Sequence, residues 1–392
     1  MKKKTIGVIF GSRSVEHEIS IITGHQVMDA IDKYKYNVVP IYISKAGEWF
    51  TGTYLLDINN FKNLDLISLK TSKIVNLKFV SKNSLFLETK SSFLKTDKIE
   101  IDIAFPVIHG TFGEDGKIQG LFEMLNIPYV GAGVTSSAIG MDKILMKDVF
   151  KSNNLPIVNY TWIKRKEWET DPASCITKVE SMLKYPMFVK PANLGSSVGI
   201  NKAENKDKLT ETIEIAKFYD SRIIIEESVE SAKEINCAVL GNNEPIASTC
   251  EEVMTWKSFL DYDSKYISGQ KSKTSSKRGG HIIPAALSAS VAKNIQTLAV
   301  EAFKVVDCRG IARIDFLLDP KTNKIYINEI NTMPGAISYY LWEASGISFT
   351  KLIDNLINLA LESFEDSKRN ITSIDTKVLL QDFRSNRNSN KL

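Results

Sequence analysis

The sequence is poor in the residues that build disulfide scaffolds and zinc sites. It has only four cysteines (Cys175, Cys237, Cys250 and Cys308), which lie far apart and form no Cys-x-x-Cys pair. We therefore expect free thiols in a reducing cytosol. The chain also has only four histidines, and no cluster of His and Cys indicates a zinc site.

Long hydrophobic runs and a strong charge excess are also missing. No window approaches the roughly 20 apolar residues of a membrane span. The run Ile6–Phe10 is too short for a signal peptide and predicts a first strand. With 50 basic and 46 acidic residues, the net charge of +4 favours neither nucleic acid nor a membrane as partner. Local basic clusters could still hold anionic substrates.

The 392 residues are enough for two or three domains. Residues 1–140 begin with strand 6–10, a glycine-containing turn and a helix from Val15 to about Ile31, with Ser14 as a plausible N-cap. A second strand at 38–43 makes this an α/β opening, with a loop where parallel sheets bind ligands. Residues 44–100 are interpreted as an elaboration of this domain.

Two further domains are expected, at 141–227 and 228–365, followed by a polar tail at 366–392. The middle domain combines a helix at 141–153, strands at 186–191 and 223–227, and a glycine loop. The last domain has a helix capped by Ser288 and running to about Val306. No internal repeat is present.

The most informative motif is a hairpin formed by residues 313–316 and 328–335. It can bring Asp315, Glu329 and Asn331 to one face, because Glu329 and Asn331 are two apart on one strand. Carboxylate and amide oxygens of this kind suit Mg²⁺. The alternative is a hairpin that simply has a polar outer face.

A glycine loop follows at residues 191–200. Gly195 and Gly199 permit close backbone approach, so that hydroxyls and N–H groups can hold phosphate oxygens. It is not a P-loop, since no Gly-Lys-Ser or Gly-Lys-Thr is present. A simple hairpin turn is the alternative, which Lys190 and Lys143 make less attractive because two lysines suit the charge of a triphosphate.

Three further segments admit both a functional and a structural interpretation. The glycine-rich loop 109–120 could form a ligand wall or a structural turn. Glu16 and Glu18 could simply complement a helix dipole, and His17 and His25 are interpreted as structural. The polar stretch 267–280 after Tyr266 could be a mobile loop over a site or a surface insertion.

Taken together, these segments resemble the D-alanine–D-alanine ligase family of the ATP-grasp superfamily, over roughly residues 4 to 361. The motifs that carry the resemblance, in chain order, lie at residues 14–20, 109–120, 141–143, 190–199, 265–266, 313–315 and 328–335. The family implies an α/β (α+β), three-domain ATP-grasp architecture with an N-terminal parallel-sheet domain. It implies a cytoplasmic enzyme of peptidoglycan precursor synthesis that joins two D-alanines through a D-alanyl phosphate.

The resemblance also implies a site. The metal ligands would be Asp315, Glu329 and Asn331, holding two Mg²⁺ ions, or Mn²⁺. The ATP-binding residues would be Lys143, Lys190, Ser197, Glu226, Glu227 and Glu234. The catalytic residues would be Glu16, Ser196, Tyr266, Arg313 and the Gly335 backbone N–H. The substrate-binding residues would be His109, Lys265 and Ser338. A homodimer is a further expectation.

The sequence departs from the family's pattern in three places, and the third bears on the second substrate. Gly11-Ser12 replaces the usual Gly-Gly, and the basic loop from Tyr266 to Pro284 is longer than usual. The segment after Pro334-Gly335, which in the family binds the second substrate's carboxylate, is shorter here. Ser338 is expected to fill that role, and Lys265, which matches the family, could approach the same site. The acceptor stays open between D-Ala, D-Ser and D-lactate, and a non-catalytic nucleotide-binding relative is the remaining alternative.

Overall fold

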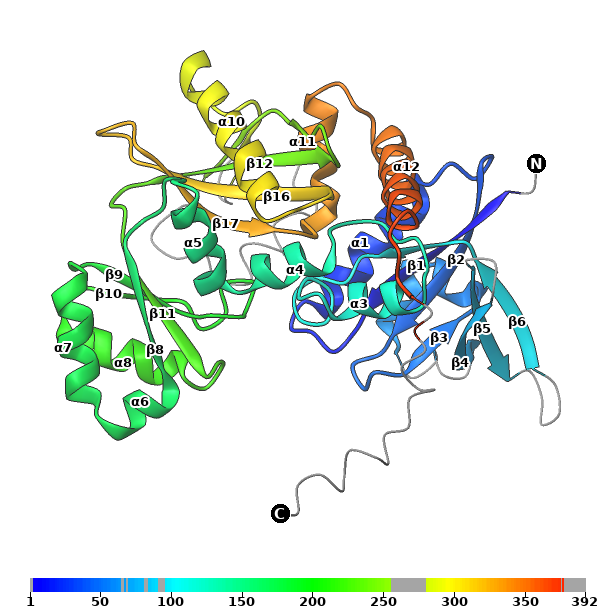
Figure 1. Cartoon of the computed structure of the whole chain (residues 1–392), viewed down its shortest axis with the longest axis horizontal. Helices are drawn as coiled ribbons and strands as arrows, with labels where there is room; N and C mark the ends of the chain where they lie inside the picture. The colour runs from blue at the N-terminus through cyan, green and yellow to red at the C-terminus, as the bar shows by residue number, and fades with distance from the viewer. Residues whose placement is uncertain are drawn as a thin grey trace, which may run out of the picture.

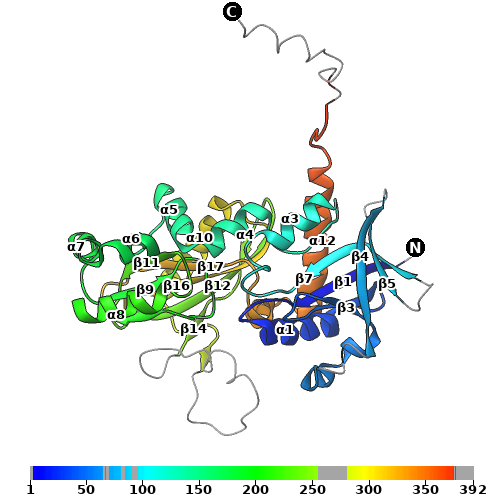
Figure 2. The ribbon, with the colours of Figure 1, turned by 90° about the horizontal axis from the view of Figure 1, so that it is seen from below.

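The computed structural model describes residues 3–64, 67, 70–80, 84–90, 96–254, 280–374 and 376. These residues form three sheets with helices packed on them, which confirms the predicted α/β class. In both Figure 1 and Figure 2 the sheet built last in the sequence lies between the other two. No helix within the described ranges is long and apolar enough to cross a membrane.

The first sheet has seven strands in the order β6-β5-β4-β3-β2-β1-β7. Strand β1 (Lys4–Gly11) pairs in parallel with β2 (Tyr36–Ile43) on one side and with β7 (Ile103–Pro106) on the other. The expected parallel core is therefore present. Residues 44–100 extend it with antiparallel strands. These are β3 (Trp49–Thr51), β4 (Ser72–Val80), β5 (Ser84–Lys90) and β6 (Thr96–Ile101), with short helices η1 (Thr53–Leu56) and η2 (Ile58–Lys62) between β3 and β4.

The first helix, α1 (His17–Ala30), begins later than predicted, and the assignment of Ser14 as its N-cap was wrong. Glu16 occupies the N-cap position and makes no side-chain cap hydrogen bond. The Ser14 hydroxyl instead accepts the Glu16 N–H at 3.1 Å and donates to the His109 carbonyl at 2.7 Å. The serine therefore ties the turn after β1 to the loop after β7.

The second sheet is antiparallel throughout, with strand order β10-β9-β11-β8. Its helix α5 begins at Lys143, because the Asp142 carboxylate accepts the N–H groups of Ile144 and Leu145 at 3.1 Å each. The strands are β8 (Tyr160–Lys164), β9 (Met187–Pro191), β10 (Asn201–Ala203) and β11 (Arg222–Glu227). The helices are α5 (Lys143–Ser152), α6 (Arg165–Thr170), α7 (Pro172–Met182) and α8 (Lys206–Ala216).

The third sheet has the order β15-β14-β12-β16-β17, and β13 pairs with β12. Helix α10 (Ala289–Val305) packs on it through Ile295, Ala299 and Phe303. The predicted N-cap is confirmed, since the Ser288 side chain accepts the Val291 N–H. The strands are β12 (Lys233–Gly241), β13 (Ile246–Ala247), β14 (Glu251–Val253), β15 (His281–Ile282), β16 (Gly310–Leu318) and β17 (Ile325–Asn331).

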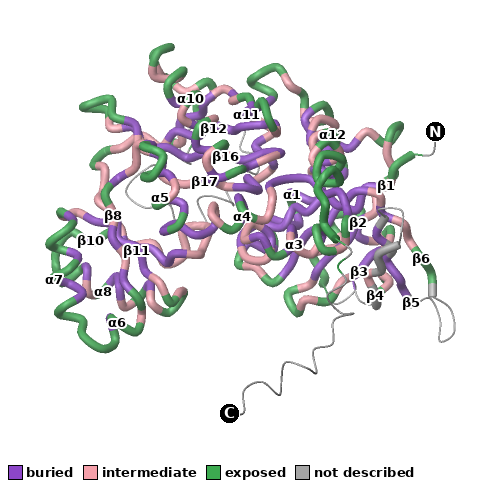
Figure 3. Tube along the Cα trace, viewed as in Figure 1, coloured by how far each residue is buried: buried purple, intermediate pink, exposed green. Residues whose placement is uncertain are grey.

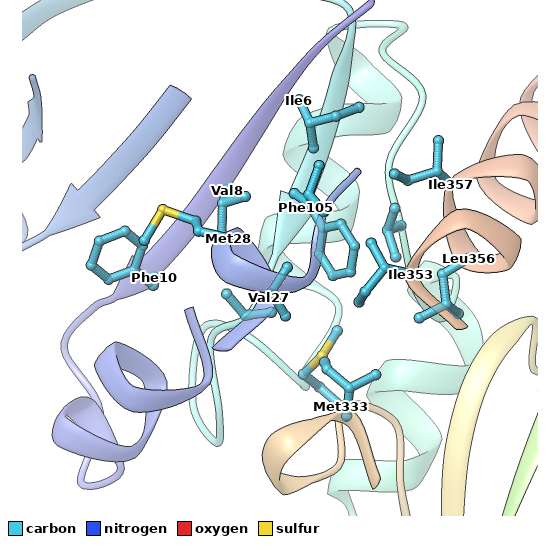
Figure 4. Packing of buried hydrophobic residues seen from close by; sticks show 14 of the residues in the cluster. Ile6, Val8, Phe10, Val27, Met28, Phe105, Met333, Ile353, Leu356 and Ile357 are labelled. Carbon is cyan, nitrogen blue, oxygen red and sulfur yellow. The ribbon is translucent and has the colours of Figure 1, made fainter. Parts of the chain in front are cut away.

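The remaining helices connect the sheets. Helices α3 (Lys117–Met124) and α4 (Val134–Met141) follow β7, and η3 (Gly335–Ser338), α11 (Tyr339–Ala344) and α12 (Phe349–Ser367) follow β17. Although α12 comes last, its Ile353, Leu356 and Ile357 pack with Ile6 and Phe105 of the first sheet (Figure 4). Burial is concentrated in the strands, and the outer faces of the helices are exposed (Figure 3). Helix α12 thus packs the segment that follows β17 against the first sheet.

The three sheets fall within the predicted segments 1–140, 141–227 and 228–365. The domain boundaries themselves stay a prediction.

Candidate active site

A cavity of about 550 Å³ lies where the first and third sheets meet the glycine loop. Its walls come from α1, the loops at 109–114 and 194–196, strands β12, β14, β15, β16 and β17, and the segment 332–336. Nine residues singled out in the sequence line it: Glu16, His109, Lys143, Ser196, Glu234, Arg313, Glu329, Asn331 and Gly335.

The hairpin of β16 and β17 forms as expected. Asp315 pairs with Glu329 and Arg313 with Asn331, and a bulge follows Asp315. The Asp315 carboxylate is buried, accepts Arg313 Nε at 2.6 Å and Nη2 at 2.7 Å, and accepts Asn331 Nδ2 at 3.0 Å. Burial disfavours the charge on Arg313, but Asp315 outweighs it and holds the arginine pKa well above its usual value.

The donor set of this hairpin fits a hard divalent cation. Two carboxylates and an amide oxygen gather on neighbouring strands, and Asn331 uses its nitrogen toward Asp315, which leaves its oxygen available. Among the described residues, no three His, Cys, Asp or Glu side chains group as a metal site. Any cation here would therefore need the amide oxygen of Asn331 and non-protein oxygens in addition to the two carboxylates.

The opposite wall joins α1 to the glycine loop. The Ser196 hydroxyl donates a short hydrogen bond to Glu16 Oε1, across 180 residues of sequence. A Cβ on Gly110, whose φ is +70°, would lie 2.5 Å from Glu16 Oε2, so this position requires glycine. Ser196 has a φ of 55° and also lies in the left-handed region. Its backbone turns the hydroxyl toward the cavity.

The side chains of His109 and Glu114 hold together two segments that line the cavity. His109 Nδ1 donates to the Met333 carbonyl at 2.9 Å, and its Nε2 accepts the Thr23 hydroxyl at 2.9 Å. Burial lowers the pKa of His109, which keeps the ring neutral. Glu114 accepts the N–H groups of Gly110 and Met333, and burial raises its pKa well above the usual value. Sequence reasoning noted this loop but missed Glu114 itself.

The two predicted lysines are held differently. Lys143 lines the cavity and donates to the Leu194 carbonyl at 2.7 Å. Lys190 is buried as well but does not line the cavity. It donates to Glu226 Oε2 at 2.7 Å, and Lys147 lies 3.4 Å from the other carboxylate oxygen. Burial raises the pKa of Glu226, but the lysines outweigh it and the net direction is downward. Lys147 was missed, although it stands one helical turn after Lys143.

Several predicted residues are not brought to the cavity wall: Asp315, Lys190, Ser197, Glu226, Glu227 and Ser338. Glu227 accepts the Lys184 N–H at 3.1 Å and Asn159 Nδ2 at 2.9 Å. Ser338 is fully buried. Lys265, Tyr266 and all of the 267–280 stretch except Gly280 lie outside the described residues.

A polar group that sequence reasoning did not find lines the cavity beside Arg313. The buried Glu251 carboxylate accepts Asn236 Nδ2 and the Tyr340 hydroxyl on Oε1, and His281 Nδ1 on Oε2, each at 2.9 Å. The members come from β12, β14, β15 and α11, and no short motif joins them. Only the fold could reveal the group.

Comparisons with known proteins agree over nearly the whole chain. The family model described as D-ala D-ala ligase N-terminus matches residues 5–132, and D-ala D-ala ligase C-terminus matches 149–358. A D-alanine–D-alanine ligase of Thermosipho africanus is 44% identical, with 95% of this chain and 97% of that protein covered. One of Chloroherpeton thalassium is 45% identical, with 94% and 99% covered.

Solved structures give the same answer for the fold. The D-alanine–D-alanine ligase from Coxiella burnetii superposes with a TM-score of 0.79 at 31% identity, covering 94% of this chain and 97% of that one. The VanG D-Ala:D-Ser ligase from Enterococcus faecalis has a TM-score of 0.77, also at 31% identity, covering 92% and 100%. The ATP-grasp architecture expected from the sequence is therefore confirmed.

Proposed function

The chain belongs to the D-alanine–D-alanine ligase family, and from this premise we propose that it joins two D-alanines with the conversion of ATP to ADP and phosphate. Relatives more than 40% identical over almost their full length carry that name. The observation that carries the proposal is one cavity with Glu16 and Ser196 on one wall and Arg313, Glu329 and Asn331 on the other.

The reaction has two steps. A carboxylate oxygen of the first D-alanine attacks the γ-phosphorus of ATP, the bond to ADP breaks, and an acylphosphate forms. The amine of the second D-alanine then attacks the acyl carbon, the C–O bond to phosphate breaks, and the amine loses a proton. The products are the dipeptide, ADP and phosphate.

The charges of the site residues match the charges that the substrates and the intermediate carry in the two steps. Glu16, oriented by Ser196, carries the negative charge that pairs with the first substrate's ammonium group. Arg313, kept cationic by Asp315, and the Gly335 N–H face the oxygen on which charge develops in the second step. His109 and Glu114 hold the backbone of Met333, in the segment after β17, and so fix the position of Gly335 two residues later.

ATP would lie toward the second sheet. Lys143 at the cavity wall offsets phosphate charge, and the glycine loop with Ser197 covers the phosphates. Lys190, whose Nζ donates to Glu226 at 2.7 Å, would also offset phosphate charge. Glu226 and Glu227 would lie on the side that receives the base, with Glu234 at the ribose. Asp315, Glu329 and Asn331 would hold two Mg²⁺ ions, which supply positive charge at the phosphate oxygens.

The acceptor is tested separately from the first step. Purified protein with ATP and Mg²⁺ should release phosphate with D-alanine and form D-Ala–D-Ala, identified by mass. D-Ser, D-lactate and L-Ala are the comparison acceptors, and D-Ser has a specific reason for inclusion in the likeness to a D-Ala:D-Ser ligase. A higher kcat/KM with D-Ser or D-lactate would replace the D-alanine assignment. If none of them leads to phosphate release, the protein is a non-catalytic, nucleotide-binding relative of the ligases.

A further inference from the structure

The acceptor side of the cavity must provide a partner for a negative charge. On the proposed function, the second D-amino acid brings a carboxylate that must be paired when water is excluded. Arg313 also lies there, but its Nε and Nη2 donate to Asp315, and the proposed function assigns its remaining N–H groups to the oxygen on which charge develops. Another donor is needed on this wall.

Ser338 does not supply it in this conformation. Ala336, Ile337 and Ser338 have φ values of 51°, 54° and 48°, three successive residues in the left-handed region. This turn places Ser338 in the interior with no exposed surface, and its hydroxyl has no hydrogen-bond partner among the residues that the structure describes. Ala336 faces the cavity in its place.

His281 is the exposed member of the polar group around Glu251. Its side chain is 56% exposed, whereas the Glu251 side chain is fully buried. His281 lines the cavity together with Gly335, Ala336 and Tyr340, and its ring lies 6.2 Å from that of Tyr340. The His281 side chain is therefore exposed to the cavity, and its hydrogen bond to the buried Glu251 fixes its orientation.

The hydrogen bonds settle which ring nitrogen is free. Nδ1 donates to Glu251, a carboxylate acceptor. Within the part of the chain that the structure describes, Nε2 has no hydrogen-bond partner. The bond to Glu251 raises the pKa of His281, against the opposing effects of burial and Arg313. The ring thus tends toward the imidazolium form, in which Nε2 is a donor with a positive charge.

We infer that His281, oriented by Glu251 and Tyr340, binds the carboxylate of the acceptor D-amino acid. The inference rests on the proposed function and adds a specificity-determining residue to it. Glu251 acts as a positioning residue, since its buried carboxylate accepts the His281 Nδ1–H and fixes the direction of the ring.

The first experiment separates the two halves of the reaction. Hydroxylamine is an amine without a carboxylate, so it traps the acylphosphate as D-alanyl hydroxamate whether or not the acceptor subsite is intact. His281→Ala should form the hydroxamate at the wild-type rate, because the first half-reaction does not use this residue. Absence of the hydroxamate with the wild-type protein would overturn the proposed function, and this inference with it.

The second experiment measures the contact itself. D-Alaninamide is an acceptor that lacks only the carboxylate charge, and it cannot serve as first substrate. The wild-type preference for D-alanine over D-alaninamide, as a ratio of kcat/KM values, should fall roughly tenfold to a hundredfold in His281→Ala. The loss should be in the acceptor KM. His281→Gln, which keeps a neutral donor near Nε2, should restore part of the preference.

Controls distinguish this role from damage to the strand. Ile282 lies next to His281 on β15 and does not line the cavity, so Ile282→Ala should keep the wild-type preference. If His281→Ala makes hydroxamate normally and still discriminates between the two acceptors as the wild type does, the acceptor carboxylate lies elsewhere and the inference is wrong.

Discussion

The carboxylate of Glu114 accepts the backbone N–H of Met333 at 2.9 Å, although 219 residues separate the two. The other carboxylate oxygen accepts the Gly110 N–H at 3.1 Å. One partly buried side chain thereby joins the loop after β7 to the segment that follows β17, which are two walls of the cavity.

Glu114→Gln should break one of these two links, because an amide offers only one acceptor oxygen. A buried N–H left without a partner costs about 1–3 kcal/mol, and we expect the free energy of unfolding in urea to fall by that amount. The acceptor KM should rise as well, since Met333 positions Gly335. Glu343 is exposed, so Glu343→Gln is the control and should change neither quantity. Equal stability of the two variants would show that the hydrogen bonds of Glu114 to Gly110 and Met333 do not stabilise the fold.

Local patterns in the sequence predicted the parts of the fold that depend on neighbouring residues. The hairpin that pairs Asp315 with Glu329 and the Ser288 cap are confirmed because alternation and capping act over a few residues. The start of α1 was predicted incorrectly because the Ser14 hydroxyl bonds to His109, a partner 95 residues away.

The candidate site also has parts that local sequence patterns predicted and parts that depend on residues distant in the sequence. Glu16, Lys143 and Arg313 line the cavity as the motifs led us to expect. The group around Glu251 draws its members from four separate elements, so no spacing in the sequence could predict it. The left-handed turn at 336–338 was also beyond prediction, because non-glycine residues rarely adopt that backbone.

Glu329→Gln should lower turnover roughly a hundredfold or more, because a neutral amide cannot match a carboxylate at a divalent cation that neutralises phosphate charge. Initial rates at saturating Mg²⁺ and ATP provide the measurement. The exposed Glu301 on α10 gives a matched carboxylate-to-amide control. Near wild-type turnover in Glu329→Gln would remove Glu329 from the metal ligands.

Lys190→Ala should weaken ATP binding and also destabilise the fold. Glu226 is buried and would keep only Lys147, whose Nζ is 3.4 Å away. Removing one partner of a buried ion pair costs up to about 3–5 kcal/mol. Calorimetry would report nucleotide affinity and urea unfolding the stability, with the exposed Lys202 of the same sheet mutated to alanine as control. Unchanged affinity with lowered stability would make Lys190 purely structural.

Ala336→Gly should raise the free energy of unfolding by about 1 kcal/mol, because a non-glycine residue in the left-handed region is strained by roughly 1–2 kcal/mol. Ala336 has a φ of 51° and a ψ of 25°. Ala344 is an exposed residue in the right-handed helix α11, where the same substitution should destabilise by up to about 1 kcal/mol. Changes of the same sign at both positions would argue against strain in the turn.

The pair of His281 and Glu251 should make stability depend on pH in a defined window. The hydrogen bond to Glu251 raises the pKa of His281 above 6.5, so this stabilisation is complete below pH 6.5 and is lost as pH rises through the native value. For Glu251, burial opposes ionisation, but His281, Arg313 and Asn236 lower its pKa below 4.5. That contribution is present above pH 4.5 and is lost as pH falls through the native value.

The difference in unfolding free energy between wild type and His281→Gln should therefore be largest between about pH 4.5 and 6.5, and should shrink on both sides. Among the described residues, the other charged or titratable groups that act on His281 or lie beside it are Arg313, Glu234 and the Tyr340 hydroxyl, whose pKa is raised by burial. They stay in place in both proteins, so the comparison isolates the histidine. Urea unfolding at a series of pH values measures it, and Ile282→Ala should shift stability equally at every pH. A difference that is constant across the series would mean that His281 is not paired in solution, and it would then lack the charge needed to hold an acceptor carboxylate.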